Sequence, residues 1–143
     1  MNRRYAEDEI KKVTTELGQR LQLNSILTLE GPLGSGKTSL VRELLVQRGV
    51  TGAVTSPTFA YVNTYADRDG NTIHHFDLYR LTSAGDFCEA GFEEYLDDET
   101  AFIIIEWPAV IGDLLLRGAR ALRVVNAALS YDTDDLSVRL LKI

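Results

Sequence analysis

The chain has 143 residues, of which 45% are hydrophobic and 25% charged, proportions that fit one globular domain over residues 1–143 and exclude a disordered or collagen-like chain. Its 21 acidic and 15 basic residues give a formal net charge of −6, which opposes direct nucleic-acid binding through a basic face. No apolar run approaches the roughly 20 residues that a membrane-spanning helix needs, and no apolar segment follows the charged N-terminus, so we expect a cytosolic protein without membrane attachment.

The first third of the chain alternates between helix and strand patterns. Apolar residues recur at three- and four-residue steps over Glu7–Leu23, which predicts an amphipathic helix. Ser25–Glu30 has the pattern of a short strand and leads directly into a glycine-rich segment. Beyond that segment, helical periodicity returns over Lys37–Gln47, and Gly49 ends it.

A loop, a hairpin and an interrupted helix are expected next. The Gly, Pro and Thr residues of Thr51–Thr58 indicate a loop. Phe59–Tyr65 and Thr72–Tyr79 are rich in aromatic and β-branched residues and are joined by strong turn signals, which predicts an antiparallel hairpin. Ser83–Leu96 is predicted to be helical, with a break near Gly91.

The last third is expected to be mainly strand. Ala101–Ile105 is continuously apolar and β-branched, which is typical of a strand covered on both faces in a parallel sheet. Val110–Leu116 is predicted to form a short helix, and Ala119–Ala127 and Leu136–Leu141 two further strands. This order of elements indicates an α/β sandwich with a mixed sheet.

The glycine-rich segment carries the strongest functional signal. Gly31-Pro32-Leu33-Gly34-Ser35-Gly36-Lys37-Thr38 matches the pattern G-x-x-x-x-G-K-[ST] and lies between a predicted strand and a predicted helix. Glycines let the backbone curl until successive N–H groups point at one anion, and the helix N-terminus favours the same phosphates. Lys37 would reach the β- and γ-phosphate oxygens, and the Thr38 hydroxyl would ligate magnesium. We therefore predict a P-loop NTPase fold that binds ATP and Mg²⁺, with further contacts from Gly34, Ser35, Gly36 and Ser39.

Glu106 is the candidate carboxylate for the magnesium ion. A P-loop site needs such a group at the end of a neighbouring buried strand. Glu106 directly follows the apolar run that ends at Ile105, and ligands of open α/β sheets lie beyond the carboxyl ends of strands. The alternative is a strand-end charge that marks the return of the chain to solvent.

Asp77 is the second candidate carboxylate. Strand alternation puts Phe76 on one face and His75 and Asp77 on the other, so Asp77 is expected to point away from the core. It would orient the attacking water or join the magnesium shell, and a structural pairing with Arg80 or another arginine is the alternative. His74 and His75 face opposite ways, so this pair predicts no metal site.

The hydroxyl-rich segment Thr55–Phe59 is a candidate switch loop. Pro57 stiffens the chain there, and the hydroxyls of Ser56 and Thr58 would sense the γ-phosphate or its magnesium ion. Ordinary turn residues would give the same pattern, so that alternative stays open.

Four runs in this order resemble the TsaE family, also called YjeE, the ATPase subunit of bacterial tRNA threonylcarbamoyladenosine synthesis. They are Gly31 to Thr38, Ser56-Pro57-Thr58-Phe59, His75-Phe76-Asp77-Leu78-Tyr79-Arg80-Leu81 and Ile105-Glu106-Trp107-Pro108. The first run is shared by many families, whereas the other three together are specific to this one. The resemblance covers about Leu17 to Pro108.

The resemblance implies slow ATP hydrolysis with Mg²⁺, within a complex with TsaD-like and TsaB-like subunits that leaves tRNA contacted only indirectly. By position, it assigns phosphate to Lys37, magnesium to Thr38 and Glu106, hydrolysis to Asp77, and the switch loop to Ser56 and Thr58. It places Trp107 near the nucleotide, although a tryptophan beside a proline is equally suited to a core. The alternatives are a small-molecule kinase with Asp77 as general base and a nucleotide-gated binding module.

Overall fold

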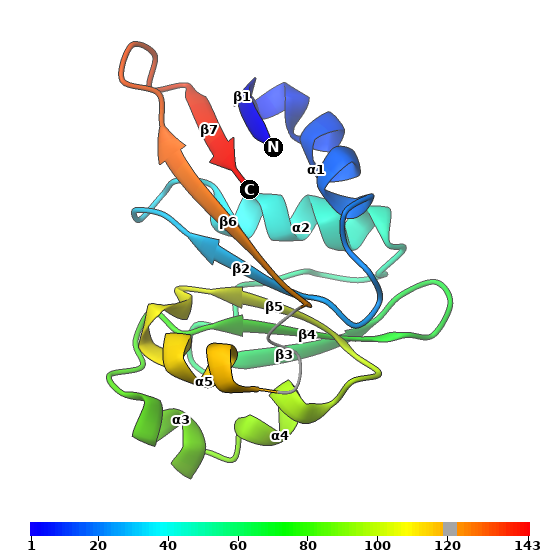
Figure 1. The fold of residues 1–143 in the computed structure, drawn as a ribbon. Coiled ribbons are helices and arrows are strands. Elements are labelled where there is room, and N and C mark those ends of the chain that lie inside the picture. Colours follow the sequence, from blue (N-terminus) through cyan, green and yellow to red (C-terminus); the bar gives the residue numbers. More distant parts are fainter. Residues whose placement is uncertain (119–122) are drawn as a thin grey trace.

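The structure is a computed structural model that describes residues 1–118 and 123–143. Within that part of the chain, seven strands form one mixed sheet in the order β1-β7-β6-β2-β5-β4-β3, with helices on both faces (Figure 1). The strands are β1 (Asn2–Ala6), β2 (Ile26–Glu30), β3 (Val62–Ala66), β4 (Thr72–Asp77), β5 (Phe102–Glu106), β6 (Val124–Tyr131) and β7 (Val138–Lys142). The helices are α1 (Ile10–Gly18), α2 (Lys37–Gln47), α3 (Ala84–Glu89), α4 (Glu93–Asp97) and α5 (Gly112–Arg117), with short 3₁₀ helices η1 (Glu7–Glu9) and η2 (Pro108–Ile111).

The middle of the sheet is parallel and both of its margins are antiparallel. β2 pairs in parallel with β5 and β6, and β4 pairs in parallel with β5. β3 joins β4, and β7 joins both β6 and β1, as antiparallel neighbours. The expected α/β fold with a mixed sheet and an antiparallel hairpin is therefore confirmed, while the interpretation as one domain over residues 1–143 stays a prediction.

Two apolar layers cover the two faces of the sheet. Helices α1 and α2 pack on one face, where their apolar side chains meet Leu27 and Ile104. Helices α3, α4 and α5 lie on the other face, against Ile103 and Ile105 (Figure 1). Because successive residues of β5 enter opposite layers, its continuously apolar sequence is explained, and the prediction of a strand covered on both faces is confirmed.

Several predicted boundaries shift for identifiable reasons. The predicted helix over Lys37–Gln47 coincides with α2, but the N-terminal helix ends at Gly18 instead of Leu23. Strand β3 begins at Val62 instead of Phe59, because Tyr61 has a positive φ of 63° that breaks the extended backbone. Gly91, with a φ of 79°, lies at the expected break between α3 and α4.

The two ends of the chain meet in the sheet. Strand β1 was not predicted, and it exists through antiparallel pairing with β7, more than a hundred residues away. Strand β6 begins at Val124, and the part of the predicted strand over residues 119–122 lies outside the described residues. None of the helices in the described ranges has the length and apolar character that crossing a membrane requires.

Substitution of Phe76 tests how much the packing of β4 against α3 and α4 stabilises the fold. The fully buried Phe76 ring contacts those of Phe87, Phe92 and Tyr95, so Phe76→Ala should lower the free energy of unfolding by about 3–5 kcal/mol. Phe59→Ala is the matched control, because that side chain is 85% exposed, and should cost less than about 1 kcal/mol. Urea unfolding followed by circular dichroism measures both, and equal losses would contradict this division.

Candidate functional site

The glycine-rich loop connects the end of β2 to the start of α2. Gly31, Gly34 and Gly36 have φ values of 149°, 75° and 96°, a backbone conformation that side chains disfavour. Gly36 precedes α2 as its N-cap and offers no capping side chain. The first N–H groups of a helix have no partner within the helix, so this loop presents amide donors that suit an anion.

Packing against β6 also requires glycine in this loop. A Cβ atom on Gly31 would lie 2.3 Å from the Leu129 carbonyl oxygen, and one on Gly34 would lie 2.7 Å from the Tyr131 hydroxyl. The Tyr131 hydroxyl donates a hydrogen bond to the Leu33 carbonyl, at 3.0 Å. Strand β6 therefore holds the glycine-rich loop in place through these contacts.

Lys37 lies at the mouth of the loop and is almost fully buried. Its Nζ donates to the carbonyl oxygens of Gly31 and Pro32, at 2.7 and 3.0 Å, and lies 3.9 Å from the centre of the Trp107 ring. Burial lowers the pKa of Lys37 below its usual range, although the charges of Glu106 and Asp77 oppose that shift. An ammonium group held by neutral carbonyls is free to exchange them for an anionic oxygen.

Ser35 adds a second fit to an anion. Its hydroxyl is buried beneath the loop and has no hydrogen-bond partner among the residues that the structure describes. Buried hydroxyls normally have a hydrogen-bond partner, so the Ser35 hydroxyl remains able to donate a hydrogen bond. Together with the curled backbone and Lys37, it makes a set of donors that fits a polyphosphate.

Thr38 and Glu106 are in contact at the floor of the site. The Thr38 hydroxyl lies 3.0 Å from Glu106 Oε2 and 3.3 Å from Oε1. Glu106 is only 2% exposed, so the alternative of a charge that returns the chain to solvent is wrong. A hydroxyl beside a carboxylate is a ligand set that suits Mg²⁺, although no cluster of three acidic, histidine or cysteine side chains suited to a metal occurs in the described ranges.

Among the described residues, Asp77 pairs with the hydroxyl loop and not with an arginine. Its Oδ2 accepts from the Ser56 hydroxyl at 2.7 Å, and Oδ1 accepts from the backbone N–H of Tyr79 at 3.1 Å. Thr58 donates in turn to Ser56, at 3.4 Å. Asp77 is only 9% exposed, yet it belongs to neither apolar layer, as strand alternation predicts. Its carboxylate borders a pocket that Arg80 also lines.

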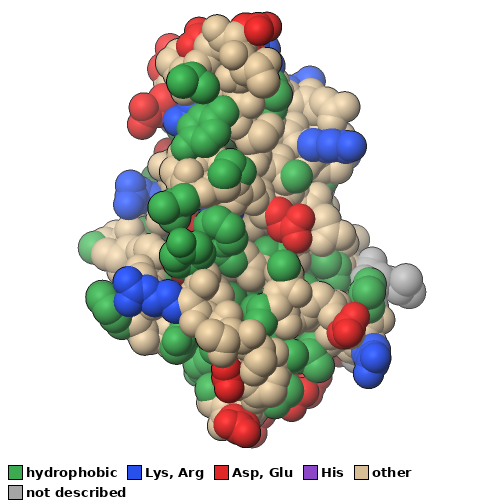
Figure 2. All heavy atoms as spheres, turned by 90° about the vertical axis from the view of Figure 1, so that its left-hand side faces the viewer, with side chains coloured by type: hydrophobic (Ala, Val, Ile, Leu, Met, Phe, Trp, Pro, Cys, Tyr) green, Lys and Arg blue, Asp and Glu red, His purple; other side chains and the backbone are tan. Residues whose placement is uncertain are grey.

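One pocket of about 400 Å³ collects nearly all of the predicted site residues. It lies on the face towards which the carboxyl ends of β2, β5 and β4 point, where Figure 2 shows hydrophobic side chains running down the surface. Every predicted residue lines it except the buried Ser35: Gly34, Gly36, Lys37, Thr38, Ser39, Ser56, Thr58, Asp77, Glu106 and Trp107. The structure thus brings together segments that are up to about 70 residues apart, as expected at the carboxyl edge of a parallel sheet.

Trp107 lines the pocket and also packs against the apolar layer that contains Ile105. The Trp107 φ of 60° is uncommon for a residue other than glycine and turns the chain sharply at the end of β5. The ring comes to lie under Lys37 and 4.8 Å from the ring of Tyr79. Residues in such sparsely populated conformations gather at functional sites.

Two residues that contact the site without lining the pocket escaped sequence interpretation. His75 was given no role, yet its Nε2 lies 2.8 Å from Glu106 Oε1. Strand alternation had already put His75 on the same face as Asp77, which was the available signal. Tyr131 gave no signal, because its contact with Leu33 joins residues 98 positions apart.

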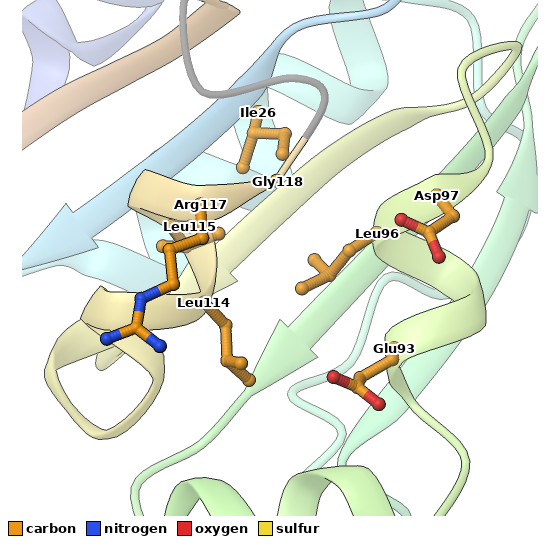
Figure 3. Close-up of a pocket in the computed structure, with 8 residues that line it drawn as sticks. All are labelled: Ile26, Glu93, Leu96, Asp97, Leu114, Leu115, Arg117 and Gly118. Carbon is orange, nitrogen blue, oxygen red and sulfur yellow. The ribbon is translucent and has the colours of Figure 1, made fainter.

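A second hollow of about 270 Å³ lies between α4 and α5, away from these residues (Figure 3). Leu96 and Leu114 point into it, and Glu93 and Asp97 lie along its α4 side. None of the predicted site residues lines it. Its mainly apolar lining presents no ligand set comparable to that of the loop pocket.

The loop, the buried strand-end carboxylate and the parallel middle of the sheet define a protein with the P-loop NTPase fold. A family model described as "Threonylcarbamoyl adenosine biosynthesis protein TsaE" matches residues 5–135. The chain therefore belongs to the TsaE family, which confirms the resemblance seen in its sequence.

Relatives and one solved structure agree with this membership. Proteins named "tRNA threonylcarbamoyladenosine biosynthesis protein TsaE" are 42% identical in Rickettsia conorii and 43% identical in Rickettsia felis, over 77% and 76% of this chain. These matches span 62% and 63% of the relatives' own lengths, so this chain spans somewhat less than two thirds of them. The crystal structure of Bacillus subtilis YdiB has the same fold, with a TM-score of 0.69 at 22% identity, over 99% of this chain and 82% of that one.

A double-mutant cycle tests how β6 holds the loop. Tyr131→Phe removes the hydrogen bond to Leu33 and should cost about 0.5–1.5 kcal/mol of unfolding free energy. Gly34→Ala should cost more than about 1 kcal/mol, because of its positive φ and its clash with the Tyr131 hydroxyl. The double variant, which lacks that hydroxyl, should lose less than the sum of the two. Urea unfolding measures all three, and strict additivity would show that the hydroxyl does not contact the loop.

Proposed function

We propose that this chain binds ATP with magnesium and hydrolyses it slowly, as the ATPase subunit of a complex that makes threonylcarbamoyladenosine in tRNA. The observation that carries this proposal is the contact of Thr38 with the buried Glu106, next to Lys37 and the curled loop. It puts oxygen ligands suited to magnesium beside donors suited to phosphate, which is the pairing that nucleoside triphosphates need. Membership of the TsaE family supports the assignment to threonylcarbamoyladenosine synthesis.

Each predicted residue has a role in this proposal. Lys37 would leave the carbonyls of Gly31 and Pro32 for phosphate oxygens, and Thr38 and Glu106 would hold the magnesium ion. The phosphates would also be bound by Gly34, Ser35, Gly36 and Ser39. Bound magnesium would neutralise charge on the phosphate oxygens.

Asp77 would act on the water and not on the phosphate. Its carboxylate borders the pocket and is oriented by the hydroxyl of Ser56 and the backbone of Tyr79. It would accept a hydrogen bond from the attacking water and so hold it in position. Ser56 and Thr58 would transmit the state of the nucleotide, because they connect the switch loop directly to Asp77. Trp107 would cover the nucleotide beside Lys37.

Action through partners is part of the same proposal. TsaD-like and TsaB-like subunits would carry the transfer chemistry and hold the tRNA in the cytoplasm, which suits a subunit with a net charge of −6. Large apolar side chains are exposed around the mouth of the pocket, where Leu33 is 68%, Phe59 85% and Tyr79 53% exposed. Exposed apolar groups around a polar site are typical of surfaces that partners cover.

Substitution of Lys37 and Asp77 tests the division of roles. Lys37→Ala should weaken the binding of a magnesium–ATP analogue at least about tenfold, because it removes a charge-assisted contact. Asp77→Asn should leave the affinity nearly unchanged and lower turnover by about 10²–10⁴-fold. Lys12→Ala and Asp69→Asn are controls on exposed surface. Calorimetry gives affinity and phosphate release gives turnover.

Three results would contradict different parts of the proposal. No binding heat with the unsubstituted chain would refute the proposal that it binds a nucleotide. Phosphate transferred to a small acceptor instead of water would replace the ATPase with a kinase that uses Asp77 as base. Turnover that rises when TsaD-like and TsaB-like subunits are added would support the complex, and unchanged turnover would remove it.

A further inference from the structure

His75 is a fully buried histidine that touches the predicted magnesium carboxylate. It lies on β4, on the same side of the strand as Asp77, and its ring faces the neighbouring strand β5. Its Nε2 lies 2.8 Å from Oε1 of Glu106, two positions further along β5 than its paired residue, Ile104. Such diagonal neighbours on one face of a sheet are within reach of long side chains.

The contact extends to the phosphate loop. Glu106 Oε2 accepts from the Thr38 hydroxyl at 3.0 Å, while Oε1 lies against His75. A chain of hydrogen bonds therefore joins β4, β5 and the first turn of α2. Because the two carboxylate oxygens have different main partners, the rotation of the Glu106 carboxylate is set by His75 on one side and Thr38 on the other.

The second ring nitrogen of His75, Nδ1, is buried and makes no hydrogen bond to the described residues. A carboxylate oxygen only accepts, so Nε2 carries a hydrogen, while Nδ1 is left without a hydrogen-bond partner. Leaving a buried polar atom unpaired is costly, and an apolar side chain of similar size would avoid that cost. The hydrogen bond to Glu106 is therefore the one interaction for which an imidazole is needed at this position.

His74 provides the contrast within the same strand. Its side chain lies on the opposite face, where Nδ1 is 2.9 Å from the Thr64 hydroxyl and the ring meets that of Tyr95 edge to face. Its Nε2 lies 3.6 Å from Asp98. Both ring nitrogens have polar neighbours there, and none of them belongs to the loop pocket, so His74 serves the fold.

We propose that His75 is a positioning residue for magnesium. By donating from Nε2 to Oε1, it holds the Glu106 carboxylate so that Oε2 stays beside the Thr38 hydroxyl, where both oxygens would face the metal of a bound magnesium–nucleotide. The proposal rests on the proposed function and adds a residue to it. His75 itself touches neither metal nor nucleotide.

Loss of His75 should separate metal binding from phosphate binding. Without the imidazole, Glu106 keeps Thr38 as its hydrogen-bond donor, and the nearby charge of Lys37 attracts it. Partners that orient metal-binding carboxylates typically contribute 10–100-fold to metal affinity. The loop amides and Lys37 do not depend on His75, so nucleotide affinity without metal should stay nearly the same.

The test compares the affinity of a non-hydrolysable ATP analogue with magnesium and with a chelator, by calorimetry on the full chain. His75→Leu should lower the ratio of these two affinities by about 10–100-fold through the magnesium measurement alone. His75→Gln, whose amide reaches the Nε2 position, should restore most of the ratio. His74→Leu is the matched control and should leave the ratio unchanged.

Each outcome decides for or against His75. An unchanged ratio in His75→Leu, or an equal loss of affinity with magnesium and with chelator, would overturn the positioning role. Should His75→Leu not fold, His75→Gln and His75→Asn replace it, because the shorter amide of asparagine does not reach Glu106; equal ratios in these two would overturn the role. No binding by the unsubstituted chain in either condition would overturn the proposed function, and this proposal with it.

Discussion

The site depends on β2 and β5 being parallel neighbours in the sheet. Their register pairs Leu29 with Glu106, and the backbone N–H of Trp107 donates to the Leu29 carbonyl. The two strands therefore end at the same level. β2 leads into the glycine-rich loop, and the last residue of β5 is Glu106. The contact of Thr38 with Glu106 follows from that register, because α2 starts where the loop returns over the end of β5. A shift of one residue would turn the Glu106 side chain to the opposite face.

Burial gives this edge of the sheet its chemical character. Lys37, Asp77 and Glu106 are all largely buried, yet each has hydrogen-bond partners. Those of Lys37 lie in the glycine-rich loop, those of Asp77 include Ser56 in the hydroxyl-rich segment, and those of Glu106 lie on β4 and α2. Burying charged groups is costly unless they are paired in this way. The two unpaired atoms in the same region, Ser35 Oγ and His75 Nδ1, are therefore informative. The first leaves a hydroxyl donor available within the glycine-rich loop, and the second supports the positioning role that we propose for His75.

Family membership and fold answer different questions about this chain. The match of the TsaE family over residues 5–135 establishes the family, and the likeness to Bacillus subtilis YdiB establishes the fold. The roles of single residues rest on the geometry of this structure. The pocket unites a loop suited to phosphate, a ligand set suited to magnesium and an oriented carboxylate, and the proposed function draws on all three.

What the sequence by itself determined was local or contiguous. The phosphate loop is a run of eight residues, α2 follows from helical periodicity, and β5 with Glu106 follows from an apolar run that ends in a charge. Strand alternation also put Asp77 and His75 on one face. Such signals are legible because they depend only on neighbours in the chain.

Only the tertiary structure decided the contacts between distant segments. The pairing of β1 with β7, the bond from Tyr131 to the loop and the contact of His75 with Glu106 depend on strand order and register. The hydrogen bond from Ser56 to the buried Asp77 likewise joins segments 21 positions apart. Sheet order brings together side chains that are 31 to 98 positions apart, and no periodicity within one segment specifies which strand will lie beside it.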